Sequence, residues 1–320
     1  MPHLQVRLFG KFSILLNEKP VNGLDAIKLQ ELLSYLLTYR GGPHARETLA
    51  ALLWGESSTA QSKKYLRQAL WQIQSTLDSQ DHDGHERIFH VEPDWISVDE
   101  RAEVWLDVAV FERAFAQARE IRGEDLDAST AQGLEDAVQL YQADFLAGWY
   151  QDWCVCERER LQTNYLIMLD KLMSYCEVQQ KYETGLTYGL TVLSYDRARE
   201  STHRRLMRLH YLAGDRTGAL RQYEHCAAAL KEELGVRPSR QTMALYDQMG
   251  ADEFSNVGRP FGSKFPQEAI TNRVSSDVEI DSVVPRVFEH LRQLRHLLKE
   301  IHQQIQQDIE KVEAALNGRR

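Results

Sequence analysis

The stretch between Thr59 and Leu77 combines side chains that could recognise a nucleic acid. Apolar residues recur there at helical spacing and predict one buried stripe, made of Leu66, Leu70, Ile73 and Leu77. The other side carries hydrogen-bonding groups: Lys64, Gln68, Trp71 and Ser75, flanked by Lys63, Arg67, Gln72 and Gln74. Lys and Arg neutralise phosphates or bind guanine, Gln binds an adenine edge, and the major groove admits one helix. Because the stretch has no Asp or Glu, we expect a cationic face for DNA.

An ordinary solvated helix face is the alternative, since three cations are a modest patch. Trp71 is unusual on such a face. It could contact DNA, contact a protein or stack against a neighbouring hairpin, and we favour packing.

The cysteines and histidines favour structural interpretations over a metal site. Cys154 and Cys156 lie two residues apart, so on a helix they point ~200° apart and cannot bind one ion. His82, His85 and His90 accompany acidic residues, but no second ligand group follows at a fixed spacing, and we interpret them as a solvated loop. We expect no metal.

Catalysis finds little support in the sequence. It contains no glycine-rich phosphate loop of the G-x-x-x-x-G-K-[ST] type, no G-x-S-x-G elbow and no H-E-x-x-H motif. We therefore predict no catalytic residues, no cofactor and no enzyme activity.

The elements that must position the Thr59–Leu77 face are short and mixed. Alternating apolar residues predict a hairpin over 4–16, and helical spacing then predicts a helix that ends before Gly41. A second helix, Arg46 to Trp54, is expected to turn Leu49, Leu52 and Leu53 inward. The recognition helix follows over 59–78, and β-rich residues at 87–98 predict a second hairpin.

From Leu106 to about Met249 the pattern is helical, with no strand signal. We expect the helices to break at five glycines: Gly123, Gly148, Gly185, Gly214 and Gly235. Similar helix starts recur 33 residues apart, at Thr184 and Thr217, close to the ~34-residue tetratricopeptide period. Such stacked helix pairs bind proteins or peptides.

Residues 251–282 are rich in Gly, Pro and Ser and predict a linker. Beyond them, apolar residues step by three and four over about four heptads, which predicts a self-associating coiled coil. Its expected contact residues are Leu291, Leu294, Leu298, Ile301, Ile305 and Val312. An amphipathic helix that packs on its own domain is the alternative, and Asp308 interrupts the seam.

Composition sets limits on the whole chain. Its 320 residues include 47 acidic and 38 basic side chains, for a net charge of −9, which repels polyanions on average. The hydrophobic content of 43% is enough for folded cores. Four scattered cysteines suit a reducing cytoplasm, and no apolar run is long enough to span a bilayer. We expect a cytoplasmic protein without membrane partners.

Several stretches resemble the SARP-type bacterial transcriptional regulators, over about residues 4–250. Arg46 to Trp54 is similar to the second helix of that family, and Leu66-Arg67-Gln68-Ala69-Leu70 to the middle of its recognition helix. Three stretches of the second region are similar to its activation domain. They are Leu106 to Glu112, Tyr141 to Gly148, and Gly214 to Leu220 running on to Glu233-Leu234-Gly235-Val236-Arg237-Pro238-Ser239.

The resemblance implies a mostly α fold: an α+β winged helix-turn-helix, an all-α tetratricopeptide-like helical-repeat domain and, in this chain, a C-terminal coiled-coil helix. The expected bounds are 1–104 for the winged helix, 105–250 for the bacterial transcriptional activation domain, 251–283 for the linker and 284–317 for the coiled coil.

The resemblance also implies that the third helix reads the major groove while the second hairpin, the wing, contacts the backbone or minor groove. Lys64, Arg67, Gln68 and Gln72 become candidate DNA contacts, and Arg46 and Arg87 become candidate phosphate contacts. The chain departs from the family where Glu92, Pro93 and Asp94 occupy the wing turn, because carboxylates there oppose phosphate.

The resulting hypothesis is a sequence-specific transcriptional regulator, an activator, that binds promoter DNA as a homo-oligomer and contacts RNA polymerase or another regulator. A protein-binding adaptor without DNA activity is the first alternative, supported by Trp71 and the acidic wing turn. A sensor that binds a small ligand in the helical region is the second.

Overall fold

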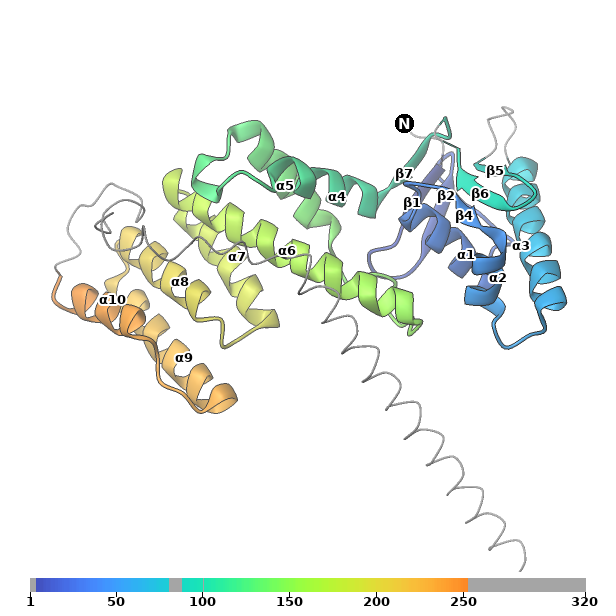
Figure 1. The fold of residues 1–320 in the computed structure, drawn as a ribbon. Coiled ribbons are helices and arrows are strands. Elements are labelled where there is room, and N and C mark those ends of the chain that lie inside the picture. Colours follow the sequence, from blue (N-terminus) through green and yellow to red (C-terminus); the bar gives the residue numbers. More distant parts are fainter. Residues whose placement is uncertain (1–3, 81–87, 100, 253–320) are drawn as a thin grey trace, which may run out of the picture. The chain divides into compact units, whose positions relative to one another are not determined.

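The computed structural model describes residues 4–80, 88–99 and 101–252 (Figure 1). The chain divides into two compact units, Met1–Val257 and Gly258–Arg320, and all described residues belong to the first. The linker and coiled coil expected over 251–317 therefore lie outside the described residues, apart from Ala251 and Asp252.

A small sheet opens the chain and includes a strand from far along the sequence. Its order is β3-β2-β1-β7, with β1 at Leu4–Arg7, β2 at Ser13–Leu16, β3 at Lys19–Pro20 and β7 at Val104–Leu106. The predicted hairpin is present, since β1 pairs antiparallel with β2, and Val6 lies opposite Ile14. The parallel β7 was not predicted, because three residues are too few to show a strand period.

Three helices and a second small sheet follow, in the arrangement of a winged helix-turn-helix. The helices are α1 at Ile27–Thr38, α2 at Arg46–Trp54 and α3 at Thr59–Gln80. The second sheet has the order β4-β6-β5, with β4 at His44–Ala45, β5 at Phe89–Val91 and β6 at Trp95–Val98. The predicted second hairpin is β5 and β6, and β4 joins it by pairing His44 with Ile96.

Two predictions of side-chain packing were wrong in this part of the chain. Leu52 is 44% exposed rather than turned inward, because Leu49 and Leu53 occupy the inner face of α2 and Leu52 points well away from them. Trp71 is 70% exposed rather than packed. It lies roughly 130° around α3 from the buried stripe, so it faces solvent.

The region after β7 is all-α within the described residues, as expected. It contains α4 at Asp107–Ala118, a short 3-10 helix η1 at Gly123–Asp125, α5 at Ala128–Leu140, α6 at Asp152–Val178, α7 at Tyr182–Tyr195, α8 at Glu200–Leu212, α9 at Arg216–Leu234 and α10 at Arg240–Gly250. Thr184 lies in α7 and Thr217 in α9, so the predicted 33-residue recurrence falls on the first helices of the pairs α7/α8 and α9/α10. Gly185 does not break a helix; it lies inside α7, where its missing side chain lets Leu209 and Cys176 approach closely.

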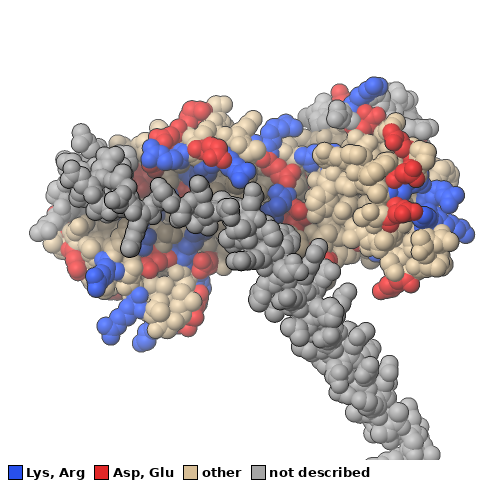
Figure 2. Space-filling model, viewed as in Figure 1, with Lys and Arg blue, Asp and Glu red and all other residues tan. Residues whose placement is uncertain are grey.

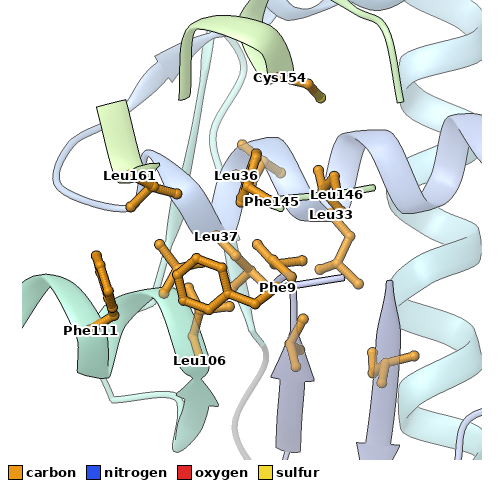
Figure 3. Close-up of a cluster of buried hydrophobic side chains, with 14 of the residues drawn as sticks. Phe9, Leu33, Leu36, Leu37, Leu106, Phe111, Phe145, Leu146, Cys154 and Leu161 are labelled. Atoms are coloured by element: carbon orange, nitrogen blue, oxygen red, sulfur yellow. The ribbon is translucent and has the colours of Figure 1, made fainter. Parts of the chain in front are cut away.

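One continuous hydrophobic core joins the winged helix to the helical region. Leu33, Leu36 and Leu37 of α1 belong to the same cluster of buried side chains as residues of α4 and α6 (Figure 3). Phe9 sits against Phe111, with ring centroids 5.2 Å apart. Residues of α2 and α3 belong to this cluster too, so the core holds both helices in position.

Candidate nucleic-acid interface

The buried stripe of α3 determines which of its side chains face outward. All four predicted stripe residues are buried: Leu66, Leu70, Ile73 and Leu77. Near the start of the helix, the buried Ser62 donates a hydrogen bond of 2.8 Å from Oγ to the carbonyl oxygen of Trp54. Because Trp54 ends α2, this bond ties α3 to the helix before it.

The outward face of α3 gathers most of the predicted contact residues. Five of them are exposed: Lys63, Lys64, Arg67, Gln68 and Trp71. Gln72 is half-buried at the edge of this face. In Figure 2, Lys and Arg side chains gather at the right of the molecule, over the part of the chain that contains α3, and acidic side chains lie beside them.

A hollow of about 650 Å³ lies between the start of α2, the first half of α3 and the turn of the wing. Its lining includes three cations, Arg46, Lys63 and Arg67, together with the acids Glu47 and Asp94. The structure therefore brings Arg46 next to residues of α3, as a shared phosphate-contacting surface requires.

Some cations of the hollow already have partners. Lys63 Nζ forms an ion pair with Glu47 Oε1, and this contact holds the pKa of the Glu47 carboxyl below its ordinary value. The Arg46 guanidinium donates to the carbonyl oxygen of Glu92 over 3.0 Å. In the described part of the chain, Lys64 and Arg67 form no ion pair.

The wing is short and acidic at its tip. Glu92 N donates to the carbonyl oxygen of Trp95 over 2.9 Å, which closes the turn, and Arg46 N donates to the carbonyl oxygen of Asp94 over 2.9 Å. His90 Nε2 lies 3.2 Å from the Glu92 carboxylate. The wing is thus hydrogen-bonded to the start of α2, and the acidic residues of its turn lie close to Arg46. Arg87, the other predicted phosphate contact, lies outside the described residues.

Comparison with known families decides the nature of the helical region. The model of the family described as "Bacterial transcriptional activator domain" matches residues 106–249. We refer to residues 106–249, which match this model, as the activator domain. The predicted resemblance to SARP-type transcriptional regulators is thereby confirmed, and the activator domain starts inside β7, directly after the winged helix.

The whole described fold also resembles a solved structure, that of Mycobacterium tuberculosis EmbR in complex with a low affinity phosphopeptide. The two agree with a TM-score of 0.62 at 16% sequence identity, over 78% of this chain and 65% of the EmbR chain. The match thus spans less than two thirds of EmbR. No curated protein matches the sequence.

Three of the four cysteines in the activator domain are buried. Cys154 is buried and Cys156 is exposed, as their spacing predicted, and burial raises the pKa of the Cys154 thiol to about 12.

Among residues 4–80, 88–99 and 101–252, no cluster of three or more His, Cys, Asp or Glu side chains could hold a metal ion. His82 and His85 lie outside these ranges, and no described helix is long and apolar enough to cross a membrane.

Two contacts were missed from the sequence, one at this surface and one at the start of the helical region. One is the pairing of Glu47 with Lys63, whose partners lie 16 residues apart on different helices. The other is Asp107, the first residue of the activator domain's α4. Its buried carboxylate accepts hydrogen bonds of 2.9 Å from the backbone N–H groups of Leu8 and Phe9. A polar residue opening a predicted helix, within the stretch Leu106 to Glu112, was the available signal.

Proposed function

We propose that the chain is a sequence-specific, DNA-binding transcriptional activator that reads the major groove with α3. The observation that carries the proposal is the outward face of α3, where Lys64, Gln68 and Trp71 lie in one exposed line beside Lys63 and Arg67. The activator domain and the winged-helix arrangement support it. Lys64 and Trp71 are separated by about 10 Å along the helix, or three base-pair steps.

Each contact has a role that follows from its chemistry. Arg67 and Gln68 can form paired hydrogen bonds with guanine and adenine edges respectively, whereas Lys63 and Lys64 neutralise phosphates. Trp71 and Gln72 extend the face. Arg46, beside the hollow, binds a phosphate of the flanking backbone.

The activator domain serves protein contacts, with RNA polymerase or another regulator as partner. The heptad segment over 284–317 joins two copies, so that two half-sites bind together and avidity rises ~10²–10⁴-fold where the geometry allows. We place the protein in the cytoplasm, without catalytic activity of its own.

The test begins with selection of bound sequences from a random duplex pool, followed by fluorescence anisotropy on the selected site. We expect the variant Lys64→Ala/Arg67→Ala to weaken binding by at least tenfold and to flatten the salt dependence by up to ~0.9 in log–log slope per lost phosphate contact. Arg221→Ala/Lys231→Ala, which removes two exposed cations of the activator domain, is the control and should bind almost normally. Equal binding by both variants would rule out this face.

A protein-binding adaptor without DNA activity is the second candidate, because Trp71 is 70% exposed and the wing turn carries Glu92 and Asp94. Chromatin immunoprecipitation with sequencing in the native host separates the two. Discrete promoter peaks support the DNA-binding regulator. The adaptor is supported if no promoter peaks are found and if no sequence is enriched from the random duplex pool.

A further inference from the structure

The ion pair between α2 and α3 is part of the proposed phosphate-contacting surface. Glu47 and Lys63 both line the hollow that Arg46 and Arg67 share. The side chains are 78% and 45% exposed, respectively, so neither is fixed by burial and both are accessible to a ligand. A DNA backbone that reaches Arg46 therefore also approaches the Glu47 carboxylate.

A carboxylate in that place has two consequences for a polyanion. It neutralises Lys63 in the free protein, so this cation contributes less to the attraction of phosphate. It also repels a phosphate that comes to Lys63, since both groups are anionic. Binding through Lys63 then becomes an exchange of one anionic partner for another.

The neighbouring charges do not compensate for this carboxylate. Asp94 lines the same hollow, and Glu92 lies in the same wing turn, where its carboxylate faces His90. Lys64 and Arg67, which form no ion pair among the described residues, remain as cations ready for DNA. The surface thus attracts DNA with fewer cations than the local sequence of α3 suggests.

We propose that Glu47 is an affinity-limiting residue, whose carboxylate holds Lys63 in the free protein and is exchanged for a DNA phosphate on binding. This inference rests on the proposed function and adds a regulatory property to it. A single winged helix binds DNA weakly by this means, and stable occupancy then depends on joining two copies.

The experiment is a double-mutant cycle on the full chain with the selected duplex, titrated at several salt concentrations. The variants are Glu47→Gln, Lys63→Met and their combination. We expect Glu47→Gln to tighten binding about two- to fivefold at low salt and to steepen the log–log salt dependence by up to ~0.9, the value of one phosphate contact. In the Lys63→Met background the same change should bring a smaller gain, because no cation is released.

Glu56→Gln is the matched control. Glu56 is an exposed acid in the turn between α2 and α3, so its substitution changes the net charge equally without touching the pair. Its effect should be the same with and without Lys63→Met.

Three outcomes overturn the inference. Weaker binding by Glu47→Gln, with a lower thermal midpoint, means that the pair is a structural link between the helices. An equal gain in both Lys63 backgrounds means that Lys63 is not exchanged. If the protein selects no sequence and binds no duplex, the proposed function is wrong and the inference is wrong with it. If the protein binds DNA but the effects of Glu47→Gln and Lys63→Met are independent, only the inference is wrong.

Discussion

At the scale of single residues, the buried carboxylate of Asp107 links two distant parts of the chain. Its side chain is 2% exposed, and it accepts hydrogen bonds from the backbone N–H groups of Leu8, Phe9 and Val108 at 2.8–2.9 Å. Burial raises the pKa of this carboxyl, while these three hydrogen bonds oppose the shift. One side chain thus links the end of β1 to the start of the activator domain.

We predict that Asp107→Asn lowers the free energy of unfolding by about 1–3 kcal/mol. One carboxylate oxygen accepts a hydrogen bond from Phe9 N and the other accepts one from Val108 N. An amide presents an N–H₂ group in place of one of these oxygens, which leaves a buried N–H donor unsatisfied. Urea denaturation followed by circular dichroism measures the loss.

The control for that measurement is Asp127→Asn. Asp127 is the N-cap of α5 and accepts a hydrogen bond from Thr130 N, a role that Asn performs almost as well. Its substitution should change the stability by a few tenths of a kcal/mol. Equal losses for the two variants would mean that the buried hydrogen bonds of Asp107 have no special weight.

At the scale of elements, glycines have opposite roles depending on where they lie in a helix. Gly235 ends α9 in the left-handed region, with φ of 67°, a conformation that costs other L-residues energy. Gly133 lies inside α5 with open space around the position of a side chain. The first therefore terminates a helix, and the second only weakens one.

We predict that Gly235→Ala destabilises the protein by about 1–2 kcal/mol, whereas Gly133→Ala stabilises it by about 0.5–1 kcal/mol. The same change of side chain thus moves the stability in opposite directions. Paired thermal or urea melts measure both. Unchanged or higher stability of Gly235→Ala would contradict the assignment of Gly235 as a helix-ending residue, and lower stability of Gly133→Ala would contradict the open space around Gly133.

At the scale of the whole molecule, the winged helix and the activator domain share backbone hydrogen bonds as well as a core. Leu146 N donates to the carbonyl oxygen of Leu8 over 2.7 Å, and Gly10 N donates to that of Asp144 over 2.9 Å. The aromatic rings of Tyr35 and Trp153 meet at 5.3 Å. We infer that the winged helix unfolds together with the adjoining helices, since their buried side chains belong to one cluster.

Assembly is the property that the heptad segment is expected to supply. We predict that deletion of residues 284–320 lowers the molar mass in solution, as measured by light scattering, from that of an oligomer to that of one chain. The full-length variant Leu294→Gln/Leu298→Gln/Ile301→Gln, which keeps the length of the chain, should show the same loss because it makes the seam polar. An unchanged mass in both would exclude the coiled coil.

How much of the fold was predictable depends on the range over which the responsible residues act. Periods of two and of three to four residues are local, and they located the first hairpin, α2, α3 and the wing. Strand β7 was not predictable, because its three residues pair with β1 about 100 positions earlier. The exposed Leu52 was assigned wrongly because its helix buries Leu49 and Leu53, and the direction of that face depends on neighbouring elements.

Helical spacing, an acid-free stretch of cations and amides, and family-like segments on either side of residue 105 are local patterns. They were therefore enough to predict the resemblance to a family and the side chains that α3 carries. The charge around α3 depends instead on how the elements pack. Packing of α2 against α3 brings Glu47 to Lys63, and the wing brings Asp94 to the same hollow. Electrostatic attraction acts through space over several ångströms, so the cationic face of α3 has acidic neighbours that its own sequence does not contain.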